Sequence, residues 1–255
     1  MIVTMPISLA VSYKSPAQRA RVVTEGWAEQ NLFCPACSAE RLSPSPRNTR
    51  AVDFECCQCK QTFQLKGKSS SFTNKVIDGA YEALMAAVSS DTVPNLFLLH
   101  YDRAAWTVAN LTLVPYFAFP PSAIECRRPL SPNARRAGWV GCYIVLSRIP
   151  AEARIAVVRD GEPIEPQNVR EQYQRLLPLT QIVAPERGWT LDVLNMARSI
   201  GPSEFTNAEM YARSHELRAR HPENRHVTDK IRQQLQILRD AGFLKHVGRG
   251  RWRLA

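Results

Sequence analysis

Apolar residues recur at helical spacing in two stretches of the first ninety residues. Ser15 and Pro16 open the first stretch, which runs to about Gln30 and places Val23 and Trp27 on one face. The second stretch, residues 74–89, repeats Val76, Ile77, Ala80, Leu84 and Val88 at the same spacing. We expect both to be helices, and the second to be amphipathic.

Short apolar runs bounded by polar residues predict strands. They lie at residues 51–55, 63–66, 96–101, 111–114, 143–146 and 154–158. Strands mixed with helices in this order indicate an α/β or α+β domain with a mixed sheet. Proline and charged residues become frequent between 160 and 187, which favours a linker there.

A second pattern begins near Trp189, which forms one helical stripe with Val193, Ala197 and Ile200. Thr206 and Glu209 have the spacing of a capping box, and we expect Thr228 to cap a longer helix. Gly242 is placed to end that helix. Strands at 243–247 and 251–254 around a turn at 248–250 would complete a winged helix, in which three helices precede a β-hairpin.

The charge of the chain favours nucleic acid as a partner. The 255 residues carry a formal net charge of +10, and residues 225–255 hold eight Lys or Arg against two Asp. No apolar run approaches the roughly 18 residues that a membrane span requires, so we expect no membrane association. Residues 1–13 are only mildly apolar, and we expect no signal peptide there.

Four of the seven cysteines form two Cys-x-x-Cys pairs, Cys34 with Cys37 and Cys56 with Cys59. Two such pairs can surround one tetrahedral Zn²⁺, and an odd cysteine count favours a metal site in a reducing, cytoplasmic compartment over a disulfide framework. A redox Cys-x-x-Cys is the alternative. Cys57 could replace Cys56 as a ligand.

The second cysteine pair lies between Asp53 and the segment Gln64-Leu65-Lys66. An acid followed by an acid or amide, any residue and then Lys is the core of the PD-(D/E)xK nuclease site. In this interpretation Asp53 and Gln64 hold Mg²⁺, and Lys66 acts on the attacked phosphate. Glu55 and Glu25 are further candidate acids. The pattern is short enough to arise by chance.

Three basic groups are candidates for contacts with DNA. Arg and Gln suit base edges in the major groove, and wing cations suit phosphates. A loop with Arg and a Gly-flanked Trp can approach a base, although the Trp could equally fill a core. The candidates are Arg232, Gln233, Gln236 and Arg239 on the long helix, Arg249 and Arg251 on the wing, and Arg135, Arg136 and Trp139 in the loop.

The chain resembles the DpnI-type restriction endonucleases, which depend on methylated adenine. The resemblance covers nearly the whole chain and is carried by segments that include residues 52–59, 134–139 and 230–240. It implies a PD-(D/E)xK restriction-endonuclease-like domain over 1–183 with an inserted zinc-binding knuckle, and a winged-helix domain over 184–255. It also implies Mg²⁺-dependent type II cleavage of double-stranded DNA at adenine-methylated GATC (Gm6ATC) sites.

The resemblance maps the metal acid of the family onto Asp53 and its lysine onto Lys66. The departure is Gln64, where the family pattern has Glu. Because a neutral amide binds Mg²⁺ more weakly, a DNA-binding regulator that does not cleave is the alternative function. We expect the protein to be a monomer.

Overall fold

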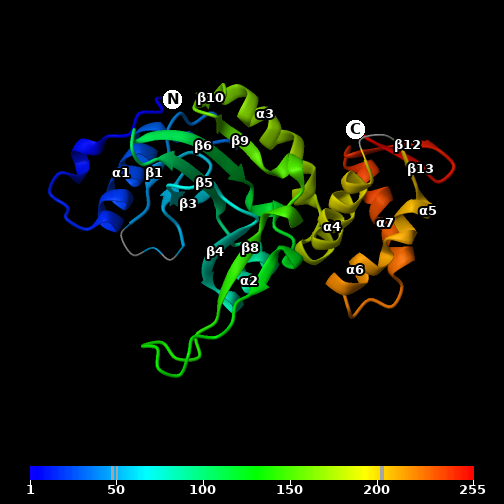
Figure 1. The fold of residues 1–255 in the computed structure, drawn as a ribbon. Helices are drawn as coiled ribbons and strands as arrows, with labels where there is room; N and C mark the ends of the chain where they lie inside the picture. The colour runs from blue at the N-terminus through cyan, green and yellow to red at the C-terminus, as the bar shows by residue number, and fades with distance from the viewer. Residues whose placement is uncertain (47–48, 50, 202–203) are drawn as a thin grey trace. The chain divides into compact units, whose positions relative to one another are not determined.

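A computed structural model describes residues 1–46, 49, 51–201 and 204–255. It divides into two compact units, each built from three stretches of chain. Figure 1 shows the ribbon coloured from the N-terminus to the C-terminus. The first unit comprises 1–73, 93–116 and 152–176, and the second comprises 74–92, 117–151 and 177–255. The predicted boundary between residues 183 and 184 stays a prediction.

The first unit is built on a seven-stranded sheet in the order β1-β2-β3-β5-β6-β9-β10. β3 and β5 run parallel, and the other neighbours are antiparallel. Helix α1 packs against β3, and α3 packs against β9. The bounds are α1 (Pro16–Asn31), β1 (Ser43–Pro44), β2 (Phe54–Glu55), β3 (Thr62–Lys68), β5 (Asn95–Asp102), β6 (Thr107–Val114), β9 (Ile155–Arg159), β10 (Glu162–Pro163) and α3 (Pro166–Leu176).

Large side chains close the core of this unit around the parallel strands. The rings of Phe63 and Phe97 stack with centroids 5.6 Å apart, and Trp27 of α1 is fully buried. Asn95 is also fully buried, and its side-chain oxygen accepts hydrogen bonds from the Tyr116 amide and the Tyr173 hydroxyl, both at 3.1 Å. Asn95 therefore connects α3 to the start of β5.

Helix α3 corrects the prediction of a linker between residues 160 and 187. Val169, Tyr173 and Leu176 recur at helical spacing and are buried, and Pro166 is the first residue of the helix. Glu171 and Arg175 are exposed on the outer face of α3, so the frequency of Pro and charged residues did not indicate a linker.

The second unit contains a three-stranded antiparallel sheet in the order β4-β8-β7, which α2 contacts. The bounds are β4 (Lys75–Ala80), α2 (Tyr81–Ser89), β7 (Ile124–Cys126) and β8 (Gly141–Val145). The predicted helix over 74–89 is therefore wrong in its first half. Val76 is 4% exposed and Ile77 60% exposed, an alternation of period two, and pairing with β8 overrides the helical spacing.

The C-terminal part of the second unit has the order of a winged helix. Helices α4, α5, α6 and α7 enclose an apolar core in which Ile231, Leu235 and Leu238 are fully buried. Strand β11 pairs with β13, and β13 pairs with β12. The bounds are α4 (Ala184–Ile200), β11 (Phe205–Thr206), α5 (Asn207–Ala212), α6 (Ser214–Arg220), α7 (Val227–Asp240), β12 (Leu244–Gly248) and β13 (Arg251–Leu254).

The predicted ends of these helices are only partly right. Thr206 and Glu209 form the predicted capping box, and Gly242, at φ +81°, follows the end of α7 as predicted. Thr228 does not cap α7, because the helix begins at Val227 with His226 at its N-cap. The Asn224 side chain accepts a hydrogen bond from the His226 amide at 2.8 Å and so shapes the turn before α7.

Short 3₁₀ helices connect several of these elements. They are η1 (Ile7–Ala10), η2 (Tyr116–Ala118), η3 (Pro121–Ala123), η4 (Leu146–Arg148), η5 (Ala151–Ala153) and η6 (Leu177–Gln181). Among the described residues, no helix is both long and apolar enough to cross a membrane.

Candidate active site and metal centre

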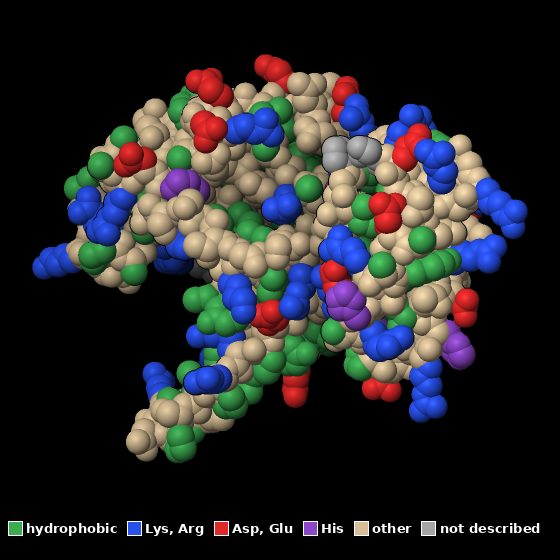
Figure 2. Space-filling model, turned by 45° about the vertical axis from the view of Figure 1, so that its right-hand side comes forward, with side chains coloured by type: hydrophobic (Ala, Val, Ile, Leu, Met, Phe, Trp, Pro, Cys, Tyr) green, Lys and Arg blue, Asp and Glu red, His purple; other side chains and the backbone are tan. Residues whose placement is uncertain are grey.

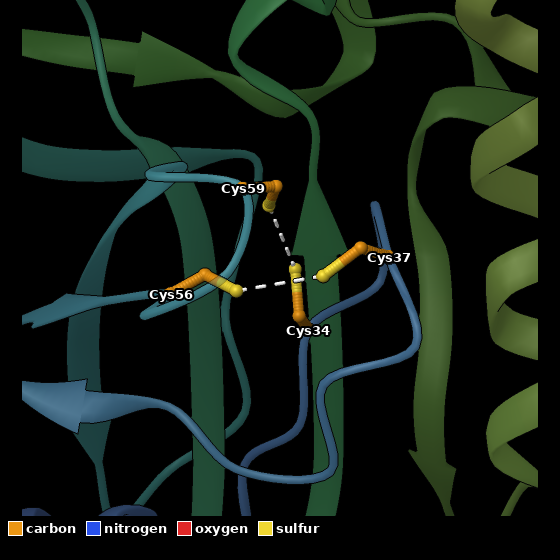
Figure 3. A group of neighbouring side chains, drawn as sticks. All are labelled: Cys34, Cys37, Cys56 and Cys59. Carbon is orange, nitrogen blue, oxygen red and sulfur yellow. Dashed lines mark hydrogen bonds between the residues drawn. The ribbon is translucent and has the colours of Figure 1, made fainter.

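The four paired cysteines come together at one point of the first unit. Cys34 and Cys37 lie on the loop after α1, and Cys56 and Cys59 lie in the turn between β2 and β3 (Figure 3). All four sulfur atoms lie within 4.8 Å of one another, and the Cys34–Cys59 and Cys37–Cys56 sulfurs are 3.5 Å apart. Tetrahedral Zn²⁺ with Zn–S bonds of about 2.3 Å would place its sulfurs about 3.8 Å apart. The group therefore fits a zinc knuckle.

Backbone hydrogen bonds shape both halves of this cluster. The Cys34 amide donates to the Ala39 carbonyl at 3.0 Å, and the Cys56 amide donates to the Gln61 carbonyl at 2.9 Å. The turn of the second half places Lys60 at φ +60°, the left-handed region. Cys57 is exposed and lies outside the group, so the geometry favours Cys56 over Cys57 as the fourth ligand.

Thiols within this cluster differ in acidity. Burial raises the pKa of the Cys34 and Cys59 thiols. Burial also acts to raise the pKa of Cys56, but hydrogen bonds from the backbone at Cys59 and Gln58 and with the Cys37 and Cys59 thiols together outweigh it and lower that pKa to about 7. Because metal ligation requires thiolates, binding at this cluster would release protons.

Helix α3 supports the cysteine loop through Arg170, a contact that the sequence interpretation missed. Its guanidinium donates to the carbonyls of Cys34 at 3.2 Å, Cys37 at 2.9 Å and Ala39 at 3.2 Å. It also lies 5.1 Å from the centre of the Phe33 ring. Arg170 thus holds the carbonyl groups of the loop that carries the first cysteine pair. No signal in the sequence indicated this role, because the three acceptors are backbone carbonyls.

The predicted acid, amide and lysine lie on neighbouring segments of the large sheet. The Asp53 amide donates to the Phe63 carbonyl at 2.8 Å, and the Asp53 carboxylate accepts a hydrogen bond from the Leu65 amide at 2.7 Å. This carboxylate therefore lies beside the strand that carries Gln64 and Lys66. These two residues are half-buried on β3 and share a face, since they are two positions apart.

Glu25 of α1 lies close to Asp53. Burial raises the pKa of the Glu25 carboxyl, Arg21 opposes this effect, and the negative charge of Asp53 adds to it. The two acids line one cleft of about 660 Å³ together with Glu29. α1 approaches the sheet closely at Gly67, where a Cβ atom would lie 3.3 Å from the Thr24 methyl group.

Glu55, the other candidate acid, is placed differently. It forms an ion pair with Lys60 at 3.7 Å, in the turn of the cysteine cluster. The geometry therefore favours Glu25 over Glu55 as a third acid beside Asp53.

Arg135, Arg136 and Trp139 lie in the long loop between β7 and β8, residues 127–140. The loop projects from its sheet (Figure 1), and Figure 2 shows basic side chains along it, all of which are arginines in this segment. Arg135 and Arg136 are exposed, and the Arg136 guanidinium lies 4.8 Å from the centre of the half-buried Trp139 ring. The ring rests on β8 rather than in a core, because a Cβ atom at Gly141 would lie 2.8 Å from it.

The candidate base-reading residues are all exposed on α7, opposite its buried stripe. Of these, Arg239 is held by its neighbour Asp240, with a nitrogen–oxygen distance of 2.7 Å. On the wing, Arg249 and Arg251 are exposed, and Arg251 pairs with Glu204 at 2.6 Å. The helix thus presents the predicted side chains to solvent.

Comparison with known families agrees with this arrangement. The model of the DpnI, or Dam-replacing, family matches residues 1–182, and that of the Dam-replacing helix-turn-helix domain matches residues 185–254. The first match contains the cysteine cluster and the acidic cleft, and the second contains α7 and the wing. A mixed α/β region with a four-cysteine cluster is thus followed by a helix-turn-helix region, and the chain belongs to the Dam-replacing family.

Proposed function

We propose that this protein is a methylation-dependent endonuclease that cleaves double-stranded DNA at adenine-methylated GATC sites by Mg²⁺-dependent hydrolysis. One observation carries the proposal beyond family membership. The Asp53 carboxylate reaches across to the Leu65 amide, so that an acid lies beside an amide and a lysine on the neighbouring strand. That arrangement has the parts that phosphodiester hydrolysis requires.

Asp53 and Gln64 would hold Mg²⁺, and Glu25, which lines the same cleft as Asp53, would be a third oxygen donor. When bound, the metal would lower the pKa of a water molecule and polarise the phosphate. The hydrogen bond from the Leu65 amide fixes the orientation of the Asp53 carboxylate. Lys66 would place its positive charge where negative charge develops on the attacked phosphate.

Two elements would bind the DNA. Exposed Arg and Gln side chains on α7 suit base edges in a major groove, and the exposed arginines of the loop 127–140 suit phosphates. One buried methyl group contributes only about 0.8 kcal/mol, roughly fourfold in affinity. Strong dependence on methylation therefore needs several methyl contacts, or an unpaired donor when the methyl group is missing.

Zinc has a separate, structural part in this proposal. Cys34, Cys37, Cys56 and Cys59 would bind one Zn²⁺. The second pair lies in the turn that joins the Asp53 segment to β3, so the ion would brace the two segments that carry the catalytic residues.

Gln64 favours a second candidate, a DNA-binding regulator that does not cleave. Its neutral amide leaves the metal site with one fewer negative charge than the family pattern has. A cleavage assay separates the two functions. Purified protein is incubated with methylated and unmethylated plasmid, with and without Mg²⁺, alongside Asp53→Asn and Lys66→Ala.

If the protein is an endonuclease, it should cut only methylated plasmid and only with Mg²⁺. Its cleavage rate should be at least about a hundredfold lower in both variants. Binding of the same duplex should stay nearly intact in both variants, because the two residues act on the transition state. Binding of methylated DNA without cleavage at any Mg²⁺ concentration would establish the regulator instead. A variant that cut at the wild-type rate would show that its residue is not catalytic.

A further inference from the structure

The loop 127–140 is an extension of its hairpin rather than a free segment. The Arg127 amide donates to the Gly141 carbonyl and the Leu130 amide to the Trp139 carbonyl, both at 2.9 Å. Together with the stacking of Trp139 over Gly141, these bonds continue the β7–β8 ladder into the loop. The position of Trp139 is therefore set by the position of this hairpin.

Helix α4 holds both outer ends of the same hairpin. Ser122, which precedes β7, donates its hydroxyl to the Asp192 carboxylate at 2.7 Å. Asn195, one turn further along α4, donates its side-chain amide to the Ser147 carbonyl at 2.8 Å, just after β8. Gly188 lets α4 approach η3, because a Cβ atom there would lie 2.9 Å from Pro121.

The Asp192 carboxylate also binds the end of α6. It is fully buried and accepts hydrogen bonds from Arg220 at 3.0 Å and from His221 at 2.8 Å. The His221 ring stacks on Trp189 of α4 with centroids 3.8 Å apart. A buried carboxylate that loses a partner is costly, so this cluster resists separation of its elements.

Helix α4 is joined to α7 by a second polar group. Glu186 pairs with Lys230 at 2.7 Å, and the Thr190 hydroxyl donates to the buried Gln234 side chain at 2.6 Å. Helix α4 thus connects α7, with its candidate base-reading residues, to the hairpin that carries Trp139.

We infer that Asp192 is a positioning residue that couples the loop 127–140 energetically to α7, so that the two read DNA as one body. The inference rests on the proposed function, because it assumes that both elements bind DNA. It adds the prediction that truncating a DNA-binding side chain on one element changes how much affinity a side chain on the other contributes.

A double-mutant cycle measures this coupling. Trp139→Ala, Gln236→Ala and their combination are titrated with methylated GATC duplex, first in the otherwise unchanged chain and then in a Ser122→Ala/Asn195→Ala background. The background removes the hydrogen bonds of α4 to Ser122 and Ser147, while Asp192 keeps Arg220 and His221. Ser199→Ala is the control, since the Ser199 hydroxyl donates to the Met196 carbonyl at 2.7 Å and accepts a hydrogen bond from Arg213 at 2.6 Å, both within the C-terminal helices.

In the unchanged chain and in the control, we expect the affinity loss of the Trp139→Ala/Gln236→Ala double variant to differ by about fivefold or more from the product of the two single losses. In the Ser122→Ala/Asn195→Ala background they should multiply to within about twofold. Asp192→Ala, which removes the acceptor of the Ser122 hydroxyl, should weaken the coupling, and Ser122→Thr, which keeps the hydroxyl, should preserve it. Multiplicative losses in the unchanged chain, or coupling that persists in the background, would overturn the inference.

Hydrogen exchange without DNA tests the brace independently of the proposed function. The Leu130 and Trp139 amides should exchange about tenfold faster in Ser122→Ala/Asn195→Ala than in Ser199→Ala, while unchanged exchange of the α7 amides verifies that the variant is folded. Equal exchange in the two variants would refute the brace. Faster exchange in a protein that does not bind DNA would instead leave the brace standing and refute the proposed function.

Discussion

Arg170 offers a sharp test of how the fold supports the cysteine cluster. Replacing it with Ala removes three hydrogen bonds to carbonyls of the cysteine loop, at 2.9 to 3.2 Å, and the contact with the Phe33 ring. A hydrogen bond from a charged donor contributes about 1.5 to 3 kcal/mol. Because the Cys34 and Cys37 carbonyls share one N–H of Arg170, two donors are lost. These would sum to about 3 to 6 kcal/mol, but water can replace part of this at a half-buried site, so we expect a loss of about 2 to 4 kcal/mol.

Part of this loss should take the form of weaker zinc binding. Residues that orient metal ligands typically change metal affinity by about 10- to 100-fold, which corresponds to about 1.4 to 2.8 kcal/mol. The assay is competition for Zn²⁺ with a chromogenic chelator at fixed pH, paired with thermal unfolding. The zinc affinity of Arg170→Lys should fall between those of the unchanged protein and Arg170→Ala, because an ammonium group cannot reproduce the planar fork of the guanidinium.

Arg175→Ala is the matched control, since Arg175 is exposed on the same helix. Equal zinc affinities in Arg170→Ala and Arg175→Ala would refute the reasoning. The carbonyl contacts of Arg170 would then stabilise the fold without orienting the metal ligands.

Three further tests concern the two proposed metal sites and one ion pair. Gln64→Glu should lower the Mg²⁺ concentration for half-maximal cleavage, because it restores a negative charge, and an inactive variant would show that the amide has a role of its own. Cys34→Ser should lose zinc and thermal stability together, whereas Cys57→Ser should retain one Zn²⁺ per chain by elemental analysis; the opposite result would contradict the ligand set. The hydrogen bond from Lys75 lowers the pKa of Glu125, so its stabilisation is present at neutral pH and lost as pH falls through that lowered pKa. Glu125→Gln should therefore lower the melting temperature at pH 7, through a loss of less than about 1 kcal/mol in the free energy of unfolding. An equal loss of stability in strong acid would contradict the assignment.

The sequence predicted features correctly where they depend on residues close together in the chain. The capping box of Thr206 and Glu209 needs only the spacing of two side chains, and the structure forms it. The two Cys-x-x-Cys pairs likewise predicted a four-cysteine cluster, because this spacing is typical of a single metal site, and the structure brings the four sulfurs together. The placement of Asp53 beside Gln64 and Lys66 followed from reading residues 51–66 as a hairpin.

Predictions failed where tertiary pairing decided the outcome. Val76 and Ile77 fit a helical stripe and a strand equally well, and the partner strand β8 lies more than sixty positions further along the chain. The role of Arg170 was hidden for the same reason, since its three acceptors are backbone carbonyls more than 130 positions away. A single sequence contains no signal for backbone acceptors at that separation.

The alternation of the two units along the chain has a consequence for protein synthesis and proteolysis. Each unit is assembled from three stretches, and every stretch of the first unit is followed by a stretch of the second. No single cut of the backbone therefore yields a fragment that contains one whole unit and nothing of the other. During synthesis the four cysteines precede α3 by more than a hundred residues, so a growing chain carries the thiols long before it carries Arg170. Each unit is complete only after its third stretch has been made, so completion of either fold is a late event in translation.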